Sequence, residues 1–157
     1  MDGARALSAG GAAAPRFPWA RWLTGAGALY TAWTIVFTWP LCRLAATHLP
    51  ATPGYGWVDL HLHLWTLAWV SHAVVTDPLH VFDANAFHPA RLTLAGSDHL
   101  LGALPVAGPV YWLTGNPVAA LNAVVLSSFP LAALAAFALV AAAIRVRVAS
   151  MPASPEP

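Results

Sequence analysis

The sequence predicts an all-α membrane protein, with two transmembrane helices and two shorter juxtamembrane or re-entrant helices between them. The chain of 157 residues is 59% hydrophobic and only 8% charged. Soluble domains carry roughly 25% charged residues, so this chain has too few charges to cover a water-facing surface. The net charge of +1 comes without a basic patch. We therefore expect membrane lipid as a partner and no nucleic acid.

The first transmembrane helix is predicted at 22–42, which is an uncharged run of 21 residues. A bilayer core of roughly 30 Å needs about 20 helical residues. Residues 1–21 are predicted to form a flexible N-terminus that carries Arg5, Arg16 and Arg21, whereas only Arg43 follows the run directly. Because positive charge favours the cytoplasmic side, we expect the N-terminus in the cytoplasm.

The second transmembrane helix is predicted at 118–144, an uncharged run of 27 residues rich in Ala, Leu and Val. Arg145 and Arg147 follow it at once, which places this end in the cytoplasm too. Residues 145–157 are rich in Pro and Ser and are predicted to be a disordered tail.

The segment 43–117 is predicted to be an extracytoplasmic loop with helices near 59–76 and 100–114. The first of these helices contains an aspartate and three histidines, and the second contains two prolines. Both are short or polar for a membrane span. A topology with four spanning helices is the alternative, and the arginines do not distinguish the two because both keep the termini in the cytoplasm.

The stretch DLHLHLWTLAW, residues 59–69, alternates an acid and two histidines. On a strand, Asp59, His61 and His63 would share one face and could bind a divalent metal. The run continues to Thr76 without a turn residue, which favours a helix that separates His61 from the other two. We therefore predict no metal site, and Asp59 stands near the helix N-terminus, where a carboxylate also caps well.

The stretch HVFDANAFHPARLTLAGSDHLLG, residues 80–102, concentrates polar side chains in a predicted loop. Asp83 and Asn85 have turn chemistry, in which the side chain bonds to the local backbone. Ser97 and Asp98 predict an N-cap for the helix that follows. Local structure accounts for these residues singly, but it does not explain why they cluster.

Several motifs resemble the N-terminal segment of bacterial multi-spanning membrane proteins related to the GT-C glycosyltransferases. They are TWPL, an aspartate ahead of LWTLAW, DPLHVFDANAFHP, TLAGSDHLLG and WLTGNP, in this order between Thr38 and the long apolar helix. The resemblance implies transfer of a sugar from a polyprenyl-phosphate donor on the outer side of the bacterial inner membrane. By position Asp59 matches the acid that serves such enzymes as catalytic base or, in some branches, as a metal ligand. The residues implied to bind substrate are Asp83, Asn85, His88, Asp98 and His99.

The resemblance covers only the beginning of such enzymes, which carry many more transmembrane helices. We therefore expect this chain to be incomplete as a catalyst and inactive alone. The alternative is a small non-catalytic integral membrane protein that packs with the helices of a partner chain. The small residues at 25–28, Gly-Ala-Gly-Ala, would allow such close packing.

Overall fold

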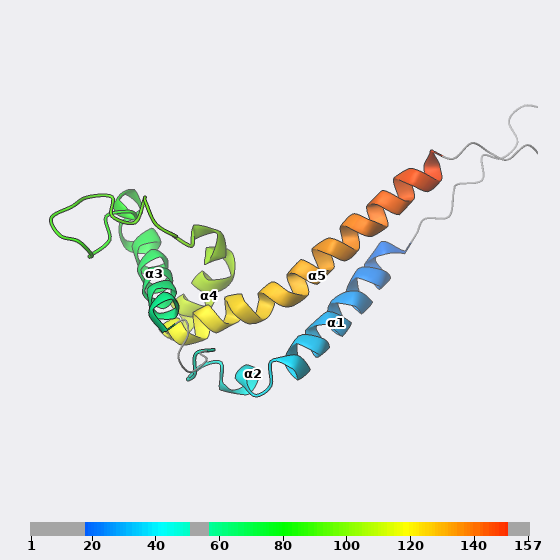
Figure 1. The fold of residues 1–157 in the computed structure, drawn as a ribbon, viewed down its shortest axis with the longest axis horizontal. Helices are drawn as coiled ribbons and strands as arrows, with labels where there is room; N and C mark the ends of the chain where they lie inside the picture. Colours follow the sequence, from blue (N-terminus) through cyan, green and yellow to red (C-terminus); the bar gives the residue numbers. More distant parts are fainter. Residues whose placement is uncertain (1–17, 51–56, 151–157) are drawn as a thin grey trace, which may run out of the picture.

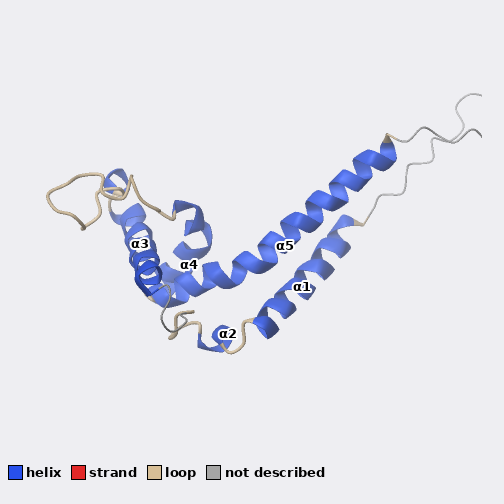
Figure 2. Cartoon of the chain, in the orientation of Figure 1, coloured by secondary structure: helices blue, strands red, loops and turns tan. Residues whose placement is uncertain are grey.

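The computed structural model describes residues 18–50 and 57–150, and within these ranges the regular structure is entirely helical (Figures 1 and 2). This confirms the predicted all-α class. The α-helices in chain order are α1 (Trp19–Phe37), α2 (Leu41–Leu44), α3 (Trp57–Thr76), α4 (Leu104–Thr114) and α5 (Pro117–Ala149). Two 3₁₀ turns, η1 (Pro78–His80) and η2 (Leu101–Ala103), flank the loop between α3 and α4.

The molecule has two parts, which meet along α5 (Figure 1). In the first, which we call the arm, α1 packs along the C-terminal part of α5. In the second, which we call the head, α3, η1, η2 and α4 gather with the first turns of α5. The ends of the arm that lead to the two chain termini lie together, far from the head.

The first helix differs from its predicted bounds of 22–42. It begins at Trp19 and ends at Phe37, and Thr38 closes it by donating its backbone N–H to the carbonyl of Thr34. Pro40 explains the early end, because proline disfavours the helical conformation of the residue before it. The remaining residues form a turn and the separate helix α2.

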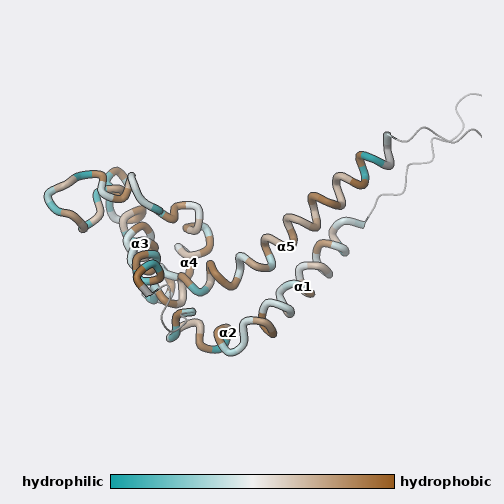
Figure 3. Tube along the Cα trace, in the orientation of Figure 1, coloured by the Kyte–Doolittle hydropathy of each residue, from teal (hydrophilic) through white to brown (hydrophobic). Residues whose placement is uncertain are grey.

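One helix in the described part of the chain, α5 over Pro117–Arg147, is long and apolar enough to cross a membrane. Figure 3 shows brown, apolar residues along most of its length. The predicted helix at 118–144 is therefore longer than expected, and Arg145 and Arg147 belong to it rather than to a tail. Residues 19–21, predicted to belong to the flexible N-terminus, are also helical, in α1, and residues 1–17 and 151–157 lie outside the described residues.

The helices predicted near 59–76 and 100–114 are both present, as α3 and as η2 with α4. Gly115 ends α4 in a left-handed conformation (φ 65°), which glycine adopts without strain. Asn116 then caps α5, because its Oδ1 accepts the N–H groups of Val118 and Ala119 at 3.0 and 3.1 Å. The Gly-Asn-Pro turn at 115–117 thus joins the two helices.

The head has a small apolar core in two clusters. One joins Val70 and Ala73 of α3 to the loop residues Val81, Ala84 and Leu94. The other joins α3, α4 and α5 through a separate set of buried side chains, namely Leu67, Ala107, Ala120 and Leu121.

A tryptophan hydrogen bond ties α4 to α3 beside these clusters. Trp112 Nε1 donates to the carbonyl of Ser71 at 2.7 Å. Its ring lies over Gly108, where an added Cβ would come within 2.9 Å of the ring. Glycine at position 108 therefore leaves room for the tryptophan to reach α3.

Candidate functional site

Asp59 stands in the first turn of α3 and its side chain is exposed. The structure records no ion pair between Asp59 and another described residue. His61 is also exposed and His63 is half-buried. The helical conformation confirms the predicted separation of these residues around the axis. Among the described residues, no three His, Cys, Asp or Glu side chains are placed to hold a metal ion.

The Asp83 carboxylate links two parts of the loop between α3 and α4. Its Oδ1 accepts the backbone N–H of Leu92 at 2.6 Å, and its Oδ2 accepts a bond from Arg91 Nη2 at 3.3 Å. The Leu92 N–H lowers the pKa of Asp83, and the Arg91 guanidinium adds to this against the opposing effect of burial. The predicted local turn bond is therefore wrong, because the carboxylate bonds to backbone nine residues away.

Further bonds hold the same loop against the end of α3. The backbone N–H of Leu94 donates to the carbonyl of Phe82 at 3.0 Å, and Thr93 Oγ1 donates to the carbonyl of Ala84 at 3.2 Å. Trp69 of α3 donates its Nε1 proton to the carbonyl of Val81 at 2.8 Å. The loop is thus a packed part of the head, with its backbone groups paired across the turn.

The other predicted substrate-binding residues lie on the exposed side of this loop. Asn85, His88 and Asp98 are exposed. His99 is exposed as well, with its ring edge-on to Phe82 at a centroid distance of 5.7 Å. His99 Nδ1 also accepts the backbone N–H of Leu101 at 3.3 Å. The predicted cap by Ser97 and Asp98 is wrong, since the residues at the N-cap positions of η2 and α4 are Leu100 and Ala103, which make no side-chain cap bond.

The structure places Asp59 and the loop residues at opposite ends of α3. The loop packs on Val70 and Ala73, and Ala73 follows Asp59 by 14 positions. At about 1.5 Å per residue, this is a separation of roughly 21 Å along the helix. Asp59 and the five loop residues therefore do not converge on one small substrate within this chain.

Two asparagines outside the predicted site residues hold the segment after α2. Asn116 Nδ2 donates to the carbonyl of Ala46 at 2.8 Å. Asn122 is fully buried, and its Nδ2 donates to the carbonyls of Ala45 and His48, both at 2.7 Å. The signal that could have found Asn122 is an amide side chain inside an otherwise apolar helix, where it needs a partner.

Asp77 is engaged as well, since one of its carboxylate oxygens lies 2.9 Å from Nδ1 of His80. Asp77, although its side chain is 60% exposed, and Asp83 thus both have an ion-pair partner, whereas the exposed Asp59 and Asp98 have none among the described residues. Of these two exposed acids, Asp59 belongs to a long helix and Asp98 to the loop.

Comparison with models of protein families, with curated proteins and with solved structures finds no match to this chain.

Proposed function

We propose that this chain is the N-terminal module of a membrane glycosyltransferase-like protein that takes a sugar from a polyprenyl-phosphate donor. Asp59 would act as the general base that removes the proton from the acceptor hydroxyl. The observation that carries the proposal is the exposure of the Asp59 side chain. Its carboxylate is exposed on a long helix, whereas Asp77 and Asp83 are committed to partners. A general base must be free to reach the proton that it takes.

The proposed topology has α1 and α5 crossing the bacterial inner membrane and the head on the extracytoplasmic side. The guanidinium of Arg145 lies 4.7 Å from the ring centre of Trp19, which supports a common side for the arginine-bearing ends of both helices. Cytoplasmic placement of these ends follows from the positive-inside rule. Trp39, at the other end of α1, is 60% exposed and suits the opposite interface.

Because Asp59 lies far from the loop, the two would not contact the same part of a substrate. A polyprenyl-phosphate sugar and an acceptor together form a long substrate, so Asp59 and the loop would contact different parts of it. Among the predicted loop ligands, Asn85, His88, Asp98 and His99 present exposed side chains. Asp83 has a structural role through Leu92 and Arg91, and its contact with substrate stays a prediction.

Replacing Asp59 with Asn tests the catalytic role, because the amide keeps the shape of the side chain and cannot take the proton. Because the chain is expected to be inactive alone, membranes from its native host, which carries each variant in place of the wild-type gene, would be incubated with a panel of undecaprenyl-phosphate-linked radiolabelled hexoses and pentoses. We expect label transfer to fall about 10²–10⁴-fold, the range for loss of a general base. Asp77→Asn is the matched control, with immunoblots for equal membrane levels. Wild-type transfer by Asp59→Asn would rule out the proposed base.

A second candidate is a non-catalytic membrane protein that packs with partner helices. The observation that favours it is the exposure of the arm, where Val36, Phe37 and Leu139 are 71%, 78% and 71% exposed. Cross-linking from these positions in intact membranes would separate the candidates. One defined cross-linked partner, with no label transfer by the wild type, would favour the packing role over catalysis.

A further inference from the structure

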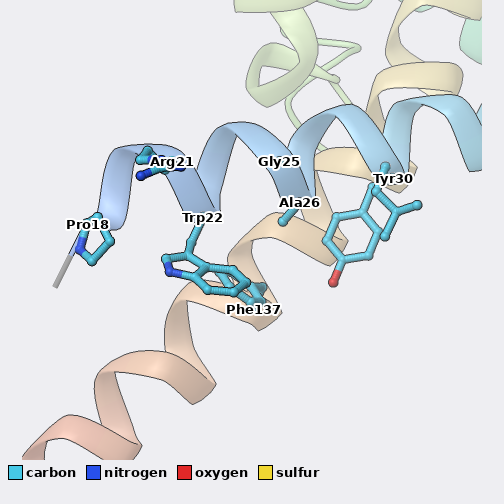
Figure 4. A pocket seen from close by; sticks show the side chains of 8 residues that line it. Pro18, Arg21, Trp22, Gly25, Ala26, Tyr30 and Phe137 are labelled. Carbon is cyan, nitrogen blue, oxygen red and sulfur yellow. The ribbon is translucent and has the colours of Figure 1, made fainter.

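An apolar groove lies between α1 and α5 at the end of the arm that is far from the head (Figure 4). Its volume is about 620 Å³, and the residues that line it include Arg21, Trp22, Gly25, Leu29, Tyr30 and Phe137. In Figure 4, Trp22, Ala26 and Tyr30 project from one side of α1 toward α5. The groove is thus lined mainly by apolar and aromatic side chains.

The floor of the groove is open at Gly25. A Cβ added to this residue would meet nothing within 4 Å. Two residues further on, a Cβ added to Gly27 would contact Leu134 of α5 at 3.5 Å. The two helices therefore touch at Gly27 and leave free space at Gly25.

Positive charge gathers at the same end of the arm. Arg21 lines the groove, and Arg145 lies over Trp19, which is half a turn of α1 before Arg21. Arg147 is in the last turn of α5. No carboxylate balances these charges within the two helices, because α1 and α5 contain no Asp or Glu.

We propose that this groove binds an anionic phospholipid, with an acyl chain along Trp22, Gly25 and Phe137 and the phosphate near Arg21 and Arg145. Charge complementarity selects this occupant: the Arg21 guanidinium in the lining of an apolar groove, with Arg145 on the adjoining end of α5, matches a phosphate that carries an acyl chain. Guanidinium groups bind phosphate in a paired geometry, and basic pockets between membrane helices on the cytoplasmic side bind anionic headgroups. The inference rests on the proposed placement of the arm in the membrane and not on catalysis by Asp59.

Lipid retention by the purified full chain tests the inference. The protein in detergent would receive dioleoyl phosphatidylglycerol or dioleoyl phosphatidylcholine, and bound lipid would be counted by native mass spectrometry. Gly25→Leu fills the groove, and Ala28→Leu adds the same side chain at an exposed position that does not line it. Arg21→Gln removes one guanidinium, and Arg43→Gln removes one from α2 at the opposite end of α1. Glycerol 3-phosphate tests whether phosphate alone is bound.

We expect wild type, Ala28→Leu and Arg43→Gln to retain phosphatidylglycerol over phosphatidylcholine. Arg21→Gln should lower this preference about fivefold, the effect of one arginine near an anionic surface. Gly25→Leu should reduce retention of both lipids. Equal retention of the two lipids by the wild type would overturn the inference, as would unchanged retention by Gly25→Leu. Competition by glycerol 3-phosphate at equal concentration would also overturn it, since the groove would then contribute nothing.

Discussion

Leu67 in the head and Leu139 in the arm are the same residue type on two apolar helices, yet they have opposite surroundings. Leu67 is 1% exposed and packs against α4 and α5, whereas Leu139 is 71% exposed. The head buries its apolar side chains within the chain. The arm turns them outward, where no other part of the described chain covers them. Similar composition thus gives a self-contained core in one region and an exposed apolar surface in the other.

The strongest test of this difference is the same substitution in both parts. Leu67→Ala should lower the free energy of unfolding by about 2–5 kcal/mol, because it leaves a cavity in the packed head. Leu139→Ala should change it by less than about 0.5 kcal/mol in detergent, as at other exposed sites. Denaturation followed by circular dichroism would measure both. Equal losses at the two positions would contradict the division into a packed head and an exposed arm.

A smaller effect is expected at the junction between the two parts. Asn122→Ala should cost about 1–3 kcal/mol, because the carbonyls of Ala45 and His48 lose their amide donor. Limited proteolysis should then cut near residues 45–48 sooner than in the wild type. The control is Asn85→Ala at an exposed position. Unchanged proteolysis of Asn122→Ala would show that the amide does not hold this segment.

The smallest expected effect concerns pH and the loop of the head. The pKa of Asp83 is lowered in the fold from its ordinary value of 3.8. Its contribution to stability is therefore present above pH 3.8 and is lost as the pH falls through the lower, folded pKa. Hydrogen exchange should show protection of the Leu92 amide at neutral pH and a decline in acid, after correction for intrinsic exchange. Asp83→Asn should remove this pH dependence, and a decline that persists in the variant would assign it to another group.

The sequence predicted the helices better than their ends. The apolar runs before Thr76 and Thr114 predicted α3 and α4 closely, because a breaker residue follows each, Pro78 after α3 and Gly115 after α4. The uncharged run from residue 22 to 42 predicted a helix end that is too late, because a count of uncharged residues ignores the local effect of Pro40. Hydropathy finds apolar segments, whereas proline geometry decides where a helix stops.

The candidate site was harder to predict than the fold. Asp83 looked like a local turn residue, but its partner is the amide of Leu92, on the other side of the loop. The clustering of polar residues along the sequence also suggested one site, whereas α3 places Asp59 far from the loop. Such long-range pairings depend on how helices pack, and a single sequence contains no direct record of them.

The hydrogen bonds of Asn116 and Asn122 also set the order in which parts of the chain fold during synthesis. The carbonyls of Ala45, Ala46 and His48 find their donors 70 to 77 residues later in the chain. At about 5–20 residues per second, a ribosome needs several seconds to supply those amides. Until then water must hydrate the three carbonyls, so the segment after α2 stays open while α3 and α4 are made. The head closes only when the start of α5 has emerged, which makes this junction a late step in the folding of the newborn chain.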